Sequence, residues 1–110
     1  MDETPLVNGE LVSDQTCVSQ KNMIHELELK GFGEIEQEKL FLKSFETLYL
    51  LYTKRLILKM NKKQIDFDSF MSICQKTDAE ILTKFLIYRD LRNRGYVVKD
   101  GFGFGSDFRV

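Results

Sequence analysis

The stretch from Tyr88 to Val110 constrains the fold more than any other part of the chain. A basic segment ends at Gly95, and glycine suits the left-handed backbone that commonly closes a helix. Residues 96–99, Tyr-Val-Val-Lys, favour a strand, and a loop with three glycines separates them from a second expected strand over residues 107–110. Because two strands alone make a marginal sheet in water, the pattern predicts the first helix and strands of a larger mixed α/β domain.

The first third of the chain predicts a hairpin and a helix. Residues 6–12, Leu-Val-Asn-Gly-Glu-Leu-Val, place Asn8-Gly9 between apolar pairs, which favours a two-residue type I′ turn. A helix is expected over residues 17–29, with Gly31 as its left-handed C-cap.

The middle of the chain predicts a strand and a buried helix. Residues 33–42 favour a turn followed by a short strand, with Leu40 and Leu42 on one side. Ser44 is expected to cap a helix over residues 45–54, because its hydroxyl can accept a hydrogen bond from a backbone N–H. The centre of that helix is apolar or aromatic all round, so we expect it to be buried on several sides.

A second strand and a third helix are expected next. Residues 56–59 favour a strand, residues 61–63 a turn, and Asp66 is a good N-cap for a helix over residues 67–75. The side chains expected to form the core of this first unit are Leu40, Leu48, Leu51, Phe67 and Phe70.

The pattern changes near Thr77. Thr77 and Glu80 fit a capping box, in which each side chain accepts a hydrogen bond from the other residue's backbone N–H. A longer helix then runs to about Asn93. Its inward stripe is expected to consist of Ile81, Leu82, Phe85 and Tyr88. We therefore predict an N-terminal mixed α/β domain over residues 1–76 and the incomplete start of a second domain over residues 77–110.

Composition and charge limit the classes of function. Hydrophobic residues make up 43% of the chain and charged residues 30%, a balance typical of a globular protein. The net charge of −1 excludes a strongly basic, histone-like nucleic-acid binder. Between Thr83 and Arg109, however, basic residues outnumber acidic ones, which is compatible with a surface that faces phosphates. An ordinary solvated helix face is the alternative interpretation of this cluster.

Cysteine and histidine usage gives no sign of a metal or cofactor. Cys17 and Cys74 are far apart and have no histidine cluster beside them, so we expect two free thiols in a reducing compartment and no zinc site. His25, the only histidine, is expected on an ordinary helix face. The acidic start and the lack of a long apolar run predict a cytoplasmic protein with no membrane association.

Residues 88–110, YRDLRNRGYVVKDGFGFGSDFRV, closely resemble the archaeal-type tRNA-splicing endonuclease family, whose pattern is roughly YRDLRxRGYxVKxGxxFGxDFRVY. Upstream, residues 31–36 (GFGEIE) and the helix segment 42–51 are similar to other stretches of that family. The resemblance implies an α/β (α+β) fold, in which a small mixed N-terminal domain precedes a nuclease-like catalytic domain.

The resemblance also implies a function. The family excises introns from precursor tRNA at bulge–helix–bulge sites. It leaves 2′,3′-cyclic phosphate and 5′-OH ends, and its chemistry uses a Tyr, a His and a Lys but no metal. Those three residues would come after Val110, so the expected catalytic set in this chain is empty. Tyr88 and Tyr96 match non-catalytic positions of the family pattern.

Residues of the basic cluster are the expected RNA-binding set: Arg89, Arg92, Lys99 and Arg109. They are expected to contact phosphates and not to distinguish bases. The glycine-rich loop is expected to be a plain connection between strands. A loop that cradles a phosphate is the alternative, although no helix N-terminus comes after it.

The implied partners are precursor tRNA, a further chain or segment that carries the rest of the catalytic domain, and other endonuclease subunits in a tetramer or pseudo-tetramer. Two other functions stay open. The chain can be a non-catalytic structural subunit that supports an active one, or an unrelated small RNA-binding module if the motif match is accidental.

Overall fold

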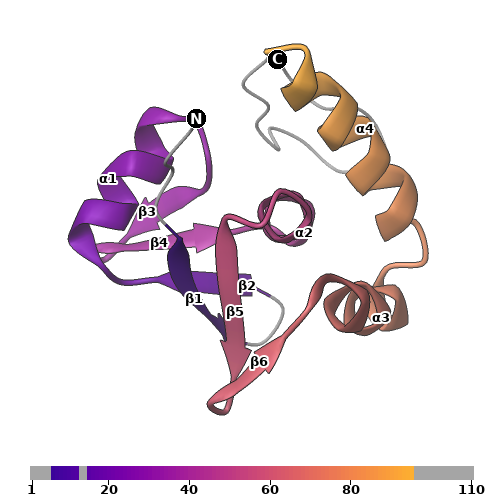
Figure 1. The fold of residues 1–110 in the computed structure, drawn as a ribbon, viewed down its shortest axis with the longest axis horizontal. Helices are drawn as coiled ribbons and strands as arrows, with labels where there is room; N and C mark the ends of the chain where they lie inside the picture. The colour runs from indigo at the N-terminus through magenta and orange to yellow at the C-terminus, as the bar shows by residue number, and fades with distance from the viewer. Residues whose placement is uncertain (1–5, 13–14, 96–110) are drawn as a thin grey trace.

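The computed structural model describes residues 6–12 and 15–95, which form a mixed sheet and four helices (Figure 1). This confirms the predicted fold class. The elements, in chain order, are β1 (Val7–Val12), β2 (Gln15–Val18), α1 (Lys21–Leu29), β3 (Glu34–Glu36), β4 (Lys39–Leu42), α2 (Ser44–Tyr52), β5 (Leu56–Met60), β6 (Lys63–Ile65), α3 (Phe67–Thr77) and α4 (Ile81–Asn93).

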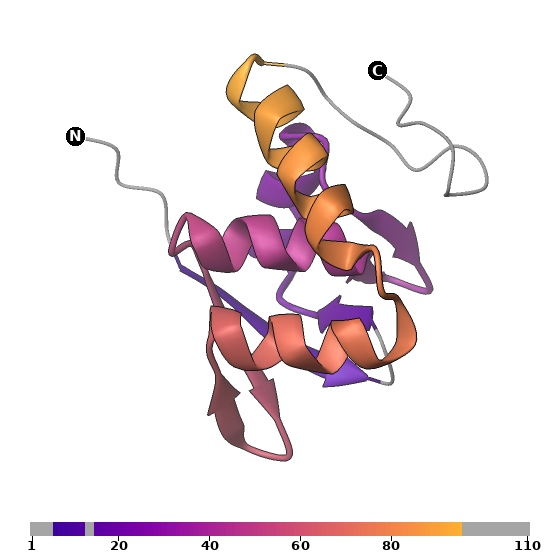
Figure 2. The same ribbon diagram turned by 90° about the vertical axis from the view of Figure 1, so that its right-hand side faces the viewer.

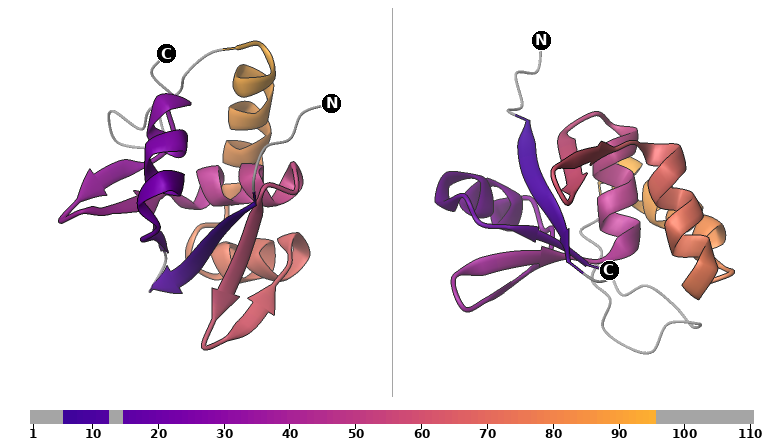
Figure 3. Two further views of the ribbon diagram at one scale, coloured as in Figure 1. Left: turned by 60° about the vertical axis from the view of Figure 1, so that its left-hand side comes forward. Right: turned by 90° about the horizontal axis from the view of Figure 1, so that it is seen from below.

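The six described strands form one twisted sheet in the order β3-β4-β2-β1-β5-β6. Neighbouring strands are antiparallel except β1 and β5, which are parallel. Figure 3 shows α1 on one side of the sheet and α2, α3 and α4 on the other. Helix α2 packs on the sheet, and α3 and α4 pack against α2 and each other (Figure 2). Helix α2 is therefore the centre of the molecule.

Most of the predicted core is confirmed. Leu40, Leu48 and Phe70 are buried, whereas Leu51 and Phe67 are half-buried and pack against the core. The expectation that the centre of α2 is buried on several sides holds for Leu48, Tyr49, Leu50 and Leu51. It fails for Tyr52, whose surface is 49% exposed.

The predicted hairpin at Asn8-Gly9 is wrong, because strand β1 runs straight through these residues. Gly9 faces Leu58 of β5 in a regular parallel ladder. A Cβ at Gly9 would lie 2.6 Å from Thr16 Cγ2 and 3.1 Å from Leu56 Cδ1. Glycine is needed here because neighbouring side chains approach the backbone closely, and not because the chain turns.

The expected helix over residues 17–29 begins too early. Residues up to Val18 form β2, and α1 starts at Lys21. The β-branched Thr16 and Val18 are fully buried and pair with Leu42 and Leu40 of β4, so sheet packing overrides the helix assignment.

The predicted end of α1 is confirmed. Gly31 has a φ of 82°, and its N–H donates to the Glu28 carbonyl oxygen at 3.0 Å. Glycine adopts this left-handed conformation without the steric penalty of a side chain.

The expected strand within residues 33–42 is confirmed as β4, with Leu40 and Leu42 both fully buried. Strand β3 was not predicted. Gln37 and Glu38, at φ 53° and 67°, join β3 to β4 in a tight turn made without glycine. The turn signal was therefore absent from the sequence.

Capping of α2 differs by one residue from the prediction. Lys43 is the N-cap, and Ser44 is the first helical residue. The Lys43 N–H donates to Glu46 Oε1 at 2.8 Å, so a glutamate in the first turn closes this end of the helix.

The strand and turn that come after α2 are confirmed as β5 and the hairpin to β6, where Asn61 and Lys62 have positive φ. Asp66 caps α3 as predicted, with its carboxylate accepting from the Ser69 N–H at 2.9 Å. Helix α3 continues to Thr77, two residues further than expected.

The predicted capping box is wrong. Thr77 belongs to α3, where its hydroxyl donates to the Cys74 carbonyl oxygen. Asp78, and not Thr77, stabilises the turn before α4. Its carboxylate accepts a hydrogen bond from the Glu80 N–H at 3.0 Å and forms a salt bridge with Lys84. An aspartate side chain that accepts from the backbone N–H two residues later is common in turns.

Helix α4 ends as expected, with Gly95 at a φ of 91°. Its inward stripe is confirmed for Ile81, Phe85 and Tyr88, but Leu82 is 46% exposed. The strands and glycine-rich loop expected within residues 96–110 lie outside the described residues. The domain boundary near Thr77 stays a prediction.

Candidate nucleic-acid interface

Helix α4 carries the two predicted RNA-binding residues that the structure describes, Arg89 and Arg92. Its buried side chains, Ile81, Phe85 and Tyr88, face α2 and α3. Arg89 and Arg92 are both half-buried. Lys99 and Arg109 lie outside the described residues, so the four side chains are not seen together.

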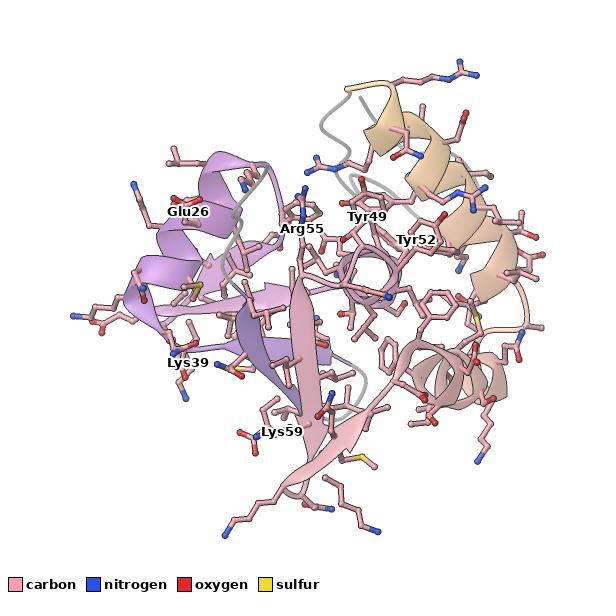
Figure 4. All side chains as sticks on the ribbon, in the orientation of Figure 1. Glu26, Lys39, Tyr49, Tyr52, Arg55 and Lys59 are labelled. Atoms are coloured by element: carbon pink, nitrogen blue, oxygen red, sulfur yellow. The ribbon has the colours of Figure 1, made fainter. Side chains whose placement is uncertain are left out.

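Arg89 lies over an aromatic cluster between the helices. Its guanidinium carbon is 5.5 Å from the Tyr52 ring centroid and 6.0 Å from that of Phe85. Phe67 completes the cluster, at 5.3 Å from Phe85 and 6.3 Å from Tyr52. Figure 4 shows Tyr49 and Tyr52 pointing from α2 towards α4. The rings hold the Arg89 guanidinium by cation–π contacts, which restrict its movement.

Arg92 is engaged at the other end of α4. Its guanidinium carbon lies 3.9 Å from the Phe32 ring centroid, and its Nη2 donates to the Lys30 carbonyl oxygen at 2.7 Å. Lys30 is the C-cap of α1, where the helix leaves unsatisfied carbonyl groups and the negative end of its dipole. Arg92, on α4, therefore caps the C-terminal end of α1.

Tyr88 lies one turn before Arg92 and is fully buried. Its ring centroid is 4.9 Å from that of Phe45 and 5.7 Å from that of Tyr49, which it meets edge-on. Burial raises the pKa of the Tyr88 hydroxyl far above its ordinary value, and the nearby Glu46 carboxylate adds to the rise. Tyr88 therefore stays protonated at neutral pH, and its ring is packed against Phe45 and Tyr49.

Glu46 was not singled out from the sequence. It is 3% exposed, and its two oxygens accept from the backbone N–H groups of Gly33 and Lys43, both at 2.8 Å. It thereby joins the segment before β3 to the start of α2. The available signal was a glutamate in the first turn of a predicted helix.

The remaining candidates do not form a site in the part of the chain that the structure describes. His25 is exposed on α1, Cys17 is half-buried and Cys74 is buried, and both thiols are free. Within residues 6–12 and 15–95, no three His, Cys, Asp or Glu side chains gather to hold a metal ion. Over the same residues, no helix is both long and apolar enough to cross a membrane.

The described residues form a small α+β module whose last described helix, α4, is basic. Two family models match the chain in succession. The first is the N-terminal domain of tRNA intron endonuclease, over residues 7–71, and the second is the catalytic C-terminal domain of the same enzyme, over residues 81–110. The chain belongs to the tRNA intron endonuclease family.

Curated relatives agree with this assignment. A tRNA-splicing endonuclease of Methanococcus maripaludis is 34% identical over 105 residues, which cover 94% of this chain and 59% of the relative. One of Pyrococcus furiosus is 34% identical over 101 residues, 91% of this chain and 59% of the relative. One of Thermococcus gammatolerans is 36% identical over 101 residues, 91% and 60%. The chain thus spans about three fifths of these relatives.

Proposed function

We propose that this chain is part of a tRNA-splicing endonuclease that excises introns from precursor tRNA. The observation that carries the proposal is the pair of family matches, which succeed each other in one chain as N-terminal and catalytic domain. Relatives that match more than nine tenths of this chain bear the name tRNA-splicing endonuclease. The two free cysteines suit a reducing cytoplasm, which is the proposed compartment.

The proposed substrate is a bulge–helix–bulge in the precursor, and the proposed reaction is an internal phosphoryl transfer. The ribose 2′-oxygen attacks the adjacent phosphorus, the bond from phosphorus to the 5′-oxygen breaks, and a proton passes from the 2′-hydroxyl to the leaving oxygen. The products are a 2′,3′-cyclic phosphate and a 5′-OH. DNA is excluded as a substrate because it lacks the 2′-hydroxyl.

We propose that the catalytic Tyr, His and Lys come from polypeptide other than the described residues, either further along the same protein or in a second chain. The described groups support this division. Tyr88 is a buried packing residue with a raised pKa, and His25 lies exposed on α1. Other endonuclease subunits complete the proposed assembly, a tetramer or pseudo-tetramer.

Arg89, Arg92, Lys99 and Arg109 are proposed to contact RNA phosphates. For Arg89 the ring contacts support the proposal, because a guanidinium held against aromatic rings is already ordered before RNA binds. For Arg92 the support is its place on the same basic helix, three residues after Arg89, with its guanidinium ordered by Phe32.

Salt titrations test these phosphate contacts. We expect Arg89→Gln to weaken binding of the assembled enzyme similarly for RNAs with different intron sequences. It should also make the plot of log affinity against log salt less steep, reducing the magnitude of its negative slope by about 0.7–0.9. Arg94→Gln is the matched control, because Arg94 is 67% exposed and pairs with Asp90 at 3.3 Å. Unchanged slopes for Arg89, Arg92, Lys99 and Arg109 variants would leave these residues only a structural role.

A non-catalytic structural subunit of the same endonuclease is the second candidate. The two candidates differ in the polypeptide that accompanies the chain. The test is to purify the chain with everything bound to it, determine intact masses, and incubate the material with an intron-containing precursor tRNA. Cleavage at both intron boundaries, with mature tRNA left intact, is the expected result. Equal degradation of both RNAs, or no cleavage by any assembly, would contradict the proposed function.

A further inference from the structure

We propose that Arg92 is a positioning residue that locks α4, the first helix of the catalytic-domain match, onto the N-terminal unit. The proposal concerns the joint between the two family-matched segments and does not rest on the proposed function. Arg92 lies in the second match, and its partners Lys30 and Phe32 lie in the first.

The geometry of the contact requires a guanidinium. The guanidinium carbon lies over the Phe32 ring, 3.9 Å from its centroid, while Nη2 of the same group donates to the Lys30 carbonyl oxygen at 2.7 Å. A planar guanidinium makes both contacts at once, because its donors lie in the plane and its faces are weakly hydrated. An ammonium group is a compact, strongly hydrated charge and cannot stack.

The partners of Arg92 are themselves fixed. Phe32 is 2% exposed, and its N–H donates to the Leu27 carbonyl oxygen at 2.9 Å. Lys30 donates its own N–H to the Glu26 and Leu27 carbonyl oxygens, both at 3.2 Å. Arg92 is therefore bound to a rigid helix end and not to a loose side chain.

A second anchor lies one turn away. Tyr88, at i−4 from Arg92, is buried against Phe45 and Tyr49 of α2, and the Tyr49 hydroxyl lies 3.4 Å from Asn93 Oδ1. Tyr88 holds α4 against α2, whereas Arg92 connects α4 to α1, on the far side of the sheet in Figure 3. Two anchors on different elements fix both the position and the rotation of the helix.

The Arg92 contact also lies close to the C-terminal end of α4. The chain leaves α4 at Gly95, three residues after Arg92, where the Gly95 N–H donates to the Arg92 carbonyl oxygen at 2.9 Å. Loss of the Arg92 contact is expected to loosen the joint while the sheet stays intact.

Hydrogen exchange in the 110-residue chain tests the lock. Arg92→Lys keeps the charge but loses the stack, and Phe32→Leu removes the ring without touching charge. We expect both variants to exchange about tenfold or more faster at α4 amides, with unchanged rates at β1 and β2 amides. Arg94→Gln, at the C-cap of α4, is the matched control, and it is expected to exchange like the parent chain.

Two results would overturn the proposal. One is an Arg92→Lys chain whose α4 is protected as in the parent, since charge alone would then suffice. The other is equal acceleration at sheet and α4 amides, which would mean general destabilisation. If Phe32→Leu unfolds the whole chain, the result for Arg92→Lys decides alone.

Binding of precursor tRNA separates this role from a phosphate contact. If Arg92 only positions α4, Arg92→Gln loses α4 protection but keeps the salt slope of the parent enzyme, whereas a slope whose magnitude falls by about 0.7–0.9 would show that Arg92 contacts a phosphate instead. Failure of the chain and its assembly to bind any RNA would count against the proposed function and leave the exchange result unaffected.

Discussion

Replacing Glu46 by glutamine is expected to destabilise the fold although the two side chains have nearly the same shape. Glu46 is almost fully buried and accepts from two backbone N–H groups, of Gly33 and Lys43, one at each oxygen. Glutamine has one carbonyl oxygen and one NH₂ group. Whichever way the amide points, one backbone N–H faces another donor.

The magnitude of the loss can be worked from these two contacts. A hydrogen bond to a charged group contributes about 1.5–3 kcal/mol, and a buried donor left unsatisfied costs a similar amount. Loss of one of the two bonds should therefore lower the free energy of unfolding by about 2 kcal/mol. For a domain of this size that corresponds to a fall in Tm of about 8–16 °C.

Thermal and urea unfolding of the 110-residue chain, monitored by circular dichroism, measure the effect. Glu34→Gln is the matched control, because Glu34 is exposed on the edge strand β3 and the charge change is the same. It is expected to change stability by less than about 0.5 kcal/mol. If Glu46→Gln and Glu34→Gln unfold at the same temperature, the two backbone bonds of Glu46 do not stabilise the fold and the reasoning is refuted.

Three further predictions concern the core, the pH dependence and the chemistry. Leu48→Ala should cost about 2–5 kcal/mol in urea unfolding, since Leu48 is fully buried at the centre of α2, whereas Leu82→Ala on the exposed side of α4 should cost under about 1 kcal/mol. Although burial works in the opposite direction, the hydrogen bond from Lys84 lowers the pKa of Asp78 below 3.8. In acid the unfolded chain therefore binds more protons than the folded chain. The parent chain should exceed Asp78→Asn in free energy of unfolding by the full amount above about pH 5, and this difference should shrink as the pH falls below about 4. The purified 110-residue chain alone should release no cyclic-phosphate product from an equimolar bulge–helix–bulge RNA, and product from that preparation would show that the chain contains its own catalytic groups.

Features with a local chemical cause were predictable from the sequence. Gly31 and Gly95 end their helices because each adopts a left-handed conformation, and Asp66 caps α3 with its own carboxylate. Each of these residues determines the structure of only a few neighbouring residues. Apolar residues two apart likewise identified β4, and apolar residues three or four apart identified most of the buried side of α4.

Features that depend on distant parts of the chain were not predictable. The Asn8-Gly9 pair has the chemistry of a turn, but its place between β2 and β5 makes it part of a straight strand. Strand β3 contains two exposed glutamates and exists because it pairs with β4. Local preference was overridden by strand pairing in both cases.

The candidate site shows the same division. Arg89 and Arg92 were identified as basic residues of one helix, which the structure confirms. The use of Arg92 depends on Lys30, 62 positions away, and that of Glu46 on Gly33, 13 positions away. Charge and spacing alone do not distinguish an arginine that faces RNA from one that closes a helix.

The measurement that tests the proposed function most directly is cleavage of a precursor tRNA that carries a single 2′-deoxyribose at one intron boundary. The assembly containing this chain is incubated with that RNA and with the all-ribose RNA, and the product ends are analysed by mass. We predict cyclic-phosphate and 5′-OH ends at both boundaries of the all-ribose RNA, and no cut at the deoxy-substituted boundary while the other is still cut. Cleavage at the deoxy position, or products with 5′-phosphate ends, would contradict the proposed function.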